Sequence, residues 1–179
     1  MRDMEDLVSL LRERNTIDQR ITGIIHRPAE KGHIAEWIAS KAFPIELNDD
    51  GNRKGYDGIF TDGDLKGKKV DVKFYPVNEH SIDLDPDVGD DVYLLIFTGS
   101  HRSSGSSKHQ ERQFRITNVY LFNERELCDS LRKDNVKVGV ASSVKTEYWE
   151  RGEIYPEDKL DLGLCMKSEV LSFFCCMQE

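Results

Sequence analysis

The chain has 179 residues, of which 38% are hydrophobic and 32% are charged, and its formal net charge is −8. This composition excludes a disordered chain and predicts one globular domain over residues 1–179. The longest apolar run, residues 92–97, is too short to cross a bilayer. The acidic first residues do not resemble a signal peptide, so we expect a cytoplasmic protein with no membrane partner.

The charge is distributed unevenly along the chain. Residues 1–98 carry a net charge of −7 and residues 146–179 a net charge of −5, whereas residues 99–145 carry +4. The overall acidity excludes a protein that coats DNA without specificity. The basic middle segment can still contact a polyanion.

The first 55 residues predict two helices and a loop. A short helix is expected at residues 4–13, with Leu7, Leu10 and Leu11 on one stripe. A second helix is expected over residues 28–43, with Pro28 in its first turn. Residues 48–55 are polar and rich in turn formers, which predicts a loop.

A β-hairpin is predicted next. Residues 56–61 and 68–75 form its strands, and residues 62–67 supply the turn. Pro76 is expected to end the second strand. The following residues, 78–91, contain six acids and no Lys or Arg, which favours a solvated loop.

The second half of the chain predicts three strands and one helix. The strands are expected at residues 91–99, 114–122 and 136–144, the last in a central position, and the helix at 123–135 with Asn123 as its N-cap. A Ser-rich loop spans residues 100–113, and the apolar tail at 164–177 should pack against the rest. This order predicts an α/β fold, bordering on α+β, in which helices flank a mixed sheet.

Three charged side chains should meet on one face of the hairpin. Alternation along residues 68–75 places Asp71 and Lys73 together, opposite Val70 and Val72. A turn symmetric about Asp64–Leu65 would place Asp57 opposite Val72, within one position of Asp71. A small adjustment of the register would then bring the two carboxylates within cross-strand reach, with Cβ atoms about 5 Å apart. Two facing carboxylates repel each other, and a hard divalent cation would offset that repulsion. Lys73 could then orient or deprotonate a water, or stabilise negative charge at phosphorus.

This pattern resembles that of the PD-(D/E)xK nucleases, the restriction-endonuclease-like superfamily. Thirteen residues separate Asp57 from Asp71-Val72-Lys73 on an adjacent strand, and a helix that carries Glu36 precedes both. The resemblance covers residues 28–75, and the order of later elements to residue 144 is compatible with it. One departure is Tyr56, which stands where the motif name has Pro.

The resemblance implies a Mg²⁺-dependent endonuclease, with Mn²⁺ as a possible substitute and no organic cofactor, that hydrolyses phosphodiester bonds in DNA. Asp57 and Asp71 would hold the metal together with the Val72 carbonyl, and either Glu36 or Glu30 would add an oxygen. Lys73 would position the attacking water. The resemblance also implies a nuclease core at about residues 28–144, a C-terminal packing element at 145–179 and a possible homodimer.

Several alternatives stay open at this point. Arg53 and Lys54 could hold a phosphate near the metal or be ordinary loop residues. Arg102, Lys108 and Arg112 could contact the nucleic-acid backbone or belong to a solvated loop. The rival function is a non-catalytic module of the same fold that binds nucleic acid or a protein partner.

Overall fold

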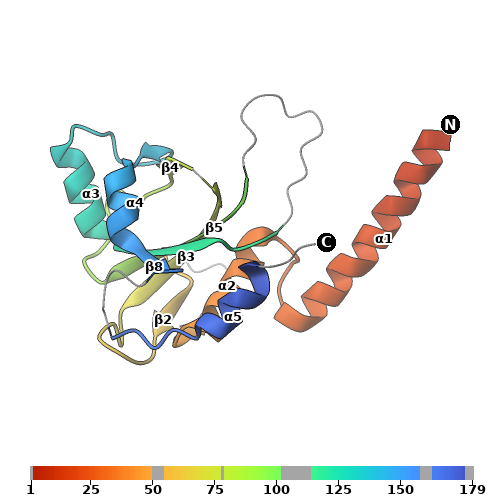
Figure 1. The fold of residues 1–179 in the computed structure, drawn as a ribbon, viewed down its shortest axis with the longest axis horizontal. Coiled ribbons are helices and arrows are strands. Elements are labelled where there is room, and N and C mark those ends of the chain that lie inside the picture. The colour runs from red at the N-terminus through yellow and green to blue at the C-terminus, as the bar shows by residue number, and fades with distance from the viewer. Residues whose placement is uncertain (1, 50–54, 78, 102–113, 158–162, 176–179) are drawn as a thin grey trace.

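The computed structural model describes residues 2–49, 55–77, 79–101, 114–157 and 163–175 (Figure 1). Within these ranges the helices are α1 (Arg2–Ile25), α2 (Lys31–Ala42), α3 (Glu124–Lys133), α4 (Thr146–Gly152) and α5 (Ser168–Cys175). The strands are β1 (Ile45–Leu47), β2 (Gly58–Phe60), β3 (Lys69–Val77), β4 (Ser81–Ile82), β5 (Val92–His101), β6 (Asn118–Asn123), β7 (Ser142–Ser143) and β8 (Glu153–Tyr155). The fold is therefore mixed α/β, as the sequence predicts.

The described strands form a mixed sheet in the order β1-β2-β3-β5-β6-β8 and a separate pair, β4-β7. β1, β2 and β3 form an antiparallel meander, which contains the predicted hairpin. β3 and β5 run parallel at the centre, and β6 and β8 extend the sheet in antiparallel fashion. The connection from β3 to β5 passes through β4, which pairs with β7 outside the main sheet.

Helices cover both faces of the sheet (Figure 1). On one face, α2 and α5 pack against side chains that include Val70, Val72, Leu95 and Phe97. On the other face, α3 and α4 pack against a second cluster that includes Leu94 and Ile96. Alternate residues of β5 thus enter opposite clusters, which explains why its sequence is apolar almost throughout.

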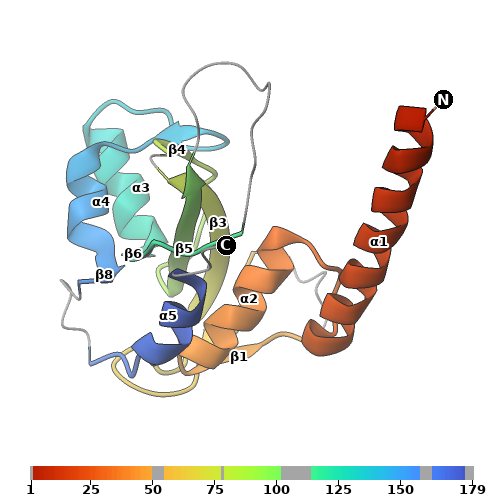
Figure 2. The ribbon, with the colours of Figure 1, turned by 45° about the vertical axis from the view of Figure 1, so that its right-hand side comes forward.

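The first helix is much longer than the predicted segment 4–13. It runs from Arg2 to Ile25 and stands away from the body of the molecule (Figure 2). The stripe of Leu7, Leu10 and Leu11 is exposed to solvent rather than packed. No helix in the described part of the chain is long and apolar enough to cross a membrane.

The prediction of a central strand at residues 136–144 is wrong. Only Ser142 and Ser143 are in a strand, and they pair with β4 outside the main sheet. Val140 is 90% exposed, and Gly139 and Ala141 both have positive φ angles, which breaks an extended conformation. The centre of the sheet is occupied by β3 and β5 instead.

Smaller differences concern the ends of elements. The second helix begins at Lys31, so Pro28 lies before it. β3 continues through Pro76 to Val77, with an irregularity in its pairing with β5 there. The acidic segment 78–91 is not wholly solvated, since it buries Ile82, Leu84 and Val88. The described part of the tail forms α5, whose Leu171 is fully buried against the α2 side of the sheet.

Candidate active site

The strand register brings Asp57 close to Asp71, just beyond the paired residues of β2 and β3. Gly58 pairs with Val70 and Ile59 with Lys69, so Asp71 is the first residue of β3 beyond this pairing. The Asp57 amide donates to the Val70 carbonyl, which keeps Asp57 level with the Val70–Asp71 segment without a regular pair of its own. The register differs by one residue from that of a turn centred between Asp64 and Leu65, which would have placed Asp57 opposite Val72. This shift is the small adjustment that cross-strand contact between the carboxylates requires.

Asp57 stands where β2 begins to pair with β3. Its main-chain amide donates a hydrogen bond to the Val70 carbonyl at 2.8 Å. Its carboxylate oxygen Oδ2 accepts a hydrogen bond from the Val72 amide at 2.7 Å. The side chain therefore satisfies a β3 amide that lies beyond the paired residues of β2. The amide and the carbonyl of one residue point to the same side of a strand. The Val72 carbonyl therefore also points to the side of β3 on which Asp57 lies.

Gly58 fixes the position of β2 immediately after Asp57. A Cβ atom on Gly58 would lie 2.6 Å from the Glu46 carbonyl oxygen of β1. Only glycine permits so close an approach of the two strands. The sequence Asp57-Gly58 thus holds the carboxylate at a defined place at the edge of the meander.

Asp71 and Lys73 form an ion pair on the same face of β3. The Lys73 Nζ and Asp71 Oδ2 atoms are 2.9 Å apart, and the side chains are 33% and 19% exposed. Burial alone would lower the pKa of Lys73, but the charges of Asp71 and Asp57 outweigh it and raise that pKa. Lys73 is therefore a cation in this site, suited to stabilise negative charge rather than to act as a base.

Burial raises the pKa of Asp57 to about 7, with the nearby charges of Asp71 and Glu36 acting in the same direction. The hydrogen bond from the Val72 amide opposes this shift without cancelling it. An acid with so high a pKa lies in surroundings short of positive charge, despite Lys73. Such perturbed carboxylates are concentrated in functional sites.

Of the two candidate glutamates, the structure brings Glu36 to the site. Glu36 is 8% exposed on α2 and forms an ion pair with Arg27, whose guanidinium also donates to the Asn48 carbonyl. Its charge contributes to the raised pKa of Asp57. Glu30, by contrast, is an exposed residue at the N-cap of α2.

Sequence reasoning missed a further acid beside Asp71. Glu124, the first residue of α3, is only 2% exposed, and its Oε1 accepts a hydrogen bond from the Asp85 amide at 2.9 Å. Burial raises the pKa of Glu124, the charge of Asp71 adds to the shift, and Lys73 opposes it. The sequence holds no signal for this position, because an acid in the first turn of a helix is the usual pattern at an exposed N-terminus.

The predicted nucleic-acid contacts cannot be placed relative to this site. Arg53, Lys54, Arg102, Lys108 and Arg112 all lie outside the described residues.

The donor set at this edge fits a hard divalent cation. Asp57 and Asp71 supply carboxylate oxygens, and the Val72 carbonyl lies along the same edge of β3. In the described ranges no three His, Cys, Asp or Glu side chains converge at metal-ligand spacing, and Glu36 is engaged by Arg27. Mg²⁺ characteristically takes only one or two protein carboxylates and fills its other positions with water and substrate phosphate. Two facing aspartates satisfy that requirement.

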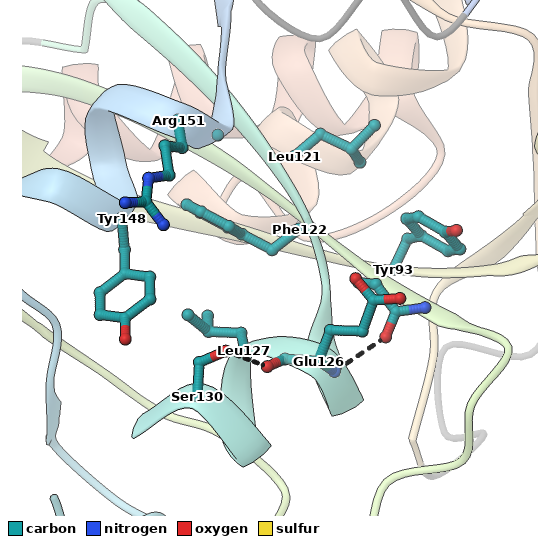
Figure 3. Close-up of a pocket in the computed structure, with 10 residues that line it drawn as sticks. Tyr93, Leu121, Phe122, Glu126, Leu127, Ser130, Tyr148 and Arg151 are labelled. Atoms are coloured by element: carbon teal, nitrogen blue, oxygen red, sulfur yellow. Dashed lines mark hydrogen bonds between the residues drawn. The ribbon is translucent and has the colours of Figure 1, made fainter. Parts of the chain in front are cut away.

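A separate cavity of about 310 Å³ lies between β6, α3 and α4 (Figure 3). Phe122 and Leu127 contribute apolar surface to it, and Tyr148 and Arg151 contribute polar atoms. None of Asp57, Asp71 and Lys73 lines this cavity. The cavity is therefore distinct from the candidate active site.

No family model and no curated protein matches the chain, so the proposal of a function below depends on the geometry at Asp57, Asp71 and Lys73.

Proposed function

We propose that this protein is a Mg²⁺-dependent endonuclease with a restriction-endonuclease-like fold that hydrolyses phosphodiester bonds in DNA. Mn²⁺ would substitute for Mg²⁺. The observation that supports the proposal best is the end of the β2–β3 pairing, where Asp57 lies beside Asp71, with Lys73 paired to Asp71 on the same face of β3. The arrangement of α2 before an antiparallel meander, with Glu36 near Asp57, agrees with the resemblance found in the sequence.

The electrostatics of the two carboxylates favour the binding of a cation at this site. Burial raises the pKa of Asp57 to about 7, and repulsion from the neighbouring charge of Asp71 adds to that shift. A purely structural strand face would gain stability from replacing one of them. A divalent cation would instead stabilise both carboxylates and would offset the negative charge that develops on a phosphate during hydrolysis.

The chain's own residues have distinct tasks in this proposal. Asp57 and Asp71 hold the cation, with the Val72 carbonyl as a further oxygen ligand. Lys73, kept protonated by the two aspartates, orients the attacking water and stabilises negative charge on the phosphate. Arg27 pairs with Glu36 and holds it where its charge acts on Asp57. Glu124, whose carboxylate is held by the Asp85 amide, lies near Asp71 and Lys73 and so supports this face from α3.

The test is incubation of the purified protein with mixed DNA and RNA substrates, in Mg²⁺ or Mn²⁺ against EDTA. We expect metal-dependent cleavage of DNA. Asp57→Asn, Asp71→Asn and Lys73→Ala should each reduce the cleavage rate by at least about a hundredfold, equivalent to ~2.7 kcal/mol of transition-state stabilisation.

Lys69→Ala is the matched control for Lys73→Ala. Lys69 lies on the same strand, four residues before Lys73, so both side chains are on one face. It pairs with the exposed Asp91 at 3.0 Å rather than with Asp71. The control should cleave at nearly the wild-type rate. Full activity in Lys73→Ala or Asp71→Asn would remove the assignment. Metal binding without cleavage of either substrate would favour a non-catalytic module of the same fold.

A further inference from the structure

Helix α1 carries a seam of apolar side chains that the described part of the chain does not cover. The seam follows alternating spacings of three and four residues through Leu7, Leu10, Arg14, Ile17, Ile21 and Ile24. Leu7, Leu10, Ile17 and Ile24 are between 49% and 61% exposed. Within α1, Ile25 alone is buried. Spacings of three and four are those of the a and d positions of a coiled coil.

A helix of this kind is not expected to remain without a partner. α1 has 24 residues and is about 36 Å long at 1.5 Å per residue. Its distal end stands clear of the sheet and of the other helices (Figures 1 and 2). Most of the stability of helices in proteins comes from packing of an apolar face, and large exposed apolar patches mark interaction surfaces. Among the described residues, nothing packs in this way against the apolar face of α1.

The charges of α1 are complementary to those of an antiparallel second copy. Residues 2–13 carry four acids and two bases, whereas residues 14–25 carry two bases and one acid. An antiparallel pair therefore places the acidic half of each helix against the basic half of the other. The helix macrodipoles also oppose each other favourably in this arrangement.

One register matches the apolar seam along its whole length. Leu7, Arg14 and Ile21 occupy a positions, and Leu10, Ile17 and Ile24 occupy d positions. If a positions face d positions, Leu7 lies against the partner's Ile24 and Leu10 against the partner's Ile21. In the same register Glu13, which flanks the seam, faces the partner's Arg20, and this contact occurs twice because of the two-fold symmetry. Arg14 is the one polar residue of the seam, and its guanidinium is directed to Asp18 of its own helix at 3.5 Å. Its aliphatic part can then cover the seam.

A parallel pair would be disfavoured by the same side chains. Parallel alignment would set Arg14 against the partner's Arg14 at an a position. It would also set Glu13 near the partner's Asp18, since g and e positions face each other in parallel coiled coils. Both contacts join like charges.

We propose that the protein forms a homodimer in which α1 pairs antiparallel with α1 of a second copy through the Leu7–Ile24 seam. The proposal goes beyond the proposed nuclease activity and does not depend on it. The interface would leave the β2–β3 edge of each copy outside the helix pair.

The test combines charge reversal with sedimentation equilibrium over a series of protein concentrations. Arg20→Glu should weaken dimerisation at least about tenfold, because it sets two acids together at both symmetric contacts. Glu13→Arg should weaken it similarly. The double variant Glu13→Arg/Arg20→Glu should restore dimerisation, because the pair is re-formed with its charges exchanged. Near-UV circular dichroism checks that every variant stays folded.

Arg12→Glu is the matched control, since it makes the same charge change on the outer face of α1 and should leave the dimer intact. A monomeric wild type would overturn the proposal. A dimer indifferent to Arg20→Glu would overturn it as well, by placing the interface elsewhere. A dimer strengthened by Glu13→Arg alone would show parallel pairing and would also contradict it.

Discussion

The Val72 amide donates a hydrogen bond of 2.7 Å to the carboxylate of Asp57, and this bond ties the first acid of the site to the backbone between Asp71 and Lys73. The acid is thus held by the strand that carries the other two charged residues. The bond stabilises the ionised form of Asp57, yet burial and the two neighbouring acids outweigh it. The backbone therefore holds a carboxylate in a position that is electrostatically unfavourable without a cation.

The metal-free protein should lose stability as the pH rises toward the pKa of Asp57 in the folded state. The pKa of Asp57 is about 7 in the folded protein, against an ordinary value of 3.8. The folded state therefore binds more protons than the unfolded state between about pH 4 and pH 7, and the free energy of unfolding falls over that range. Asp57→Asn should remove this loss and be more stable than wild type by about 4 kcal/mol at pH 8, but by less than about 2 kcal/mol at pH 5. Urea unfolding in EDTA at both pH values measures the difference.

Asp91→Asn provides the control for that experiment. Asp91 is exposed, and its hydrogen bond with Lys69 lowers its pKa, which is the opposite direction from Asp57. The control should therefore gain no stability at pH 8. An equal gain in both variants would mean that general charge repulsion, rather than the Asp57–Asp71 contact, sets the pH dependence.

The centre of the fold could be predicted because its strands carry strong patterns. The alternation at Val70 and Val72 and the apolar run of β5 each permit only one arrangement with respect to a buried core. The segment at residues 136–144 misled the prediction because valines are common in strands, whereas positive φ at Gly139 and Ala141 depends on local packing. Two-residue strands such as β7 carry no periodicity that could be recognised.

Of the candidate site, the sequence predicts only the part that lies on β3. Asp71 and Lys73 lie two residues apart, so alternation alone places them on one face. The neighbours of Asp57 on β3 depended on the centre of the turn, which lies at Asp64 rather than between Asp64 and Leu65 and so shifts the register by one residue. Burial of Glu36 and Glu124 depends on tertiary contacts with Arg27 and the Asp85 amide, which sequence spacing does not reveal.

Loss of Arg27 should destabilise the protein strongly. Its ion pair with Glu36 is largely buried, with side chains 17% and 10% exposed. Arg27→Met leaves the Glu36 carboxylate without that partner, which costs about 3–5 kcal/mol in buried pairs. Addition of Glu36→Gln should recover part of the loss, because the uncompensated charge is removed. Urea unfolding of the two variants measures this recovery, and equal stability of Arg27→Met and wild type would contradict it.

The cap of α3 should contribute a smaller, local stability. The Asn123 side chain accepts a hydrogen bond from the Glu126 amide at 3.0 Å, as the sequence predicts, and this bond is drawn beside Glu126 in Figure 3. Asn123→Ala should lower the free energy of unfolding by about 1 kcal/mol, whereas Asn123→Asp should keep most of it. The side-chain NH2 group of Asn123 also donates a hydrogen bond to the Asp90 carbonyl. Equal losses in the two variants would show that this bond matters more than the cap.

Divalent cations should stabilise the wild-type fold through Asp57 and Asp71. A ligand that binds only the folded state adds about 2.7 kcal/mol at a hundred times its Kd, so Mg²⁺, Mn²⁺ or Ca²⁺ should raise the Tm. Because the cation competes with a proton for Asp57, whose pKa is about 7, the rise should be larger at pH 8 than at pH 5.5. Asp57→Asn/Asp71→Asn should unfold at one temperature with and without metal. Thermal unfolding followed by circular dichroism measures these shifts, and an equal rise in both proteins would place the cation at another cluster of acids.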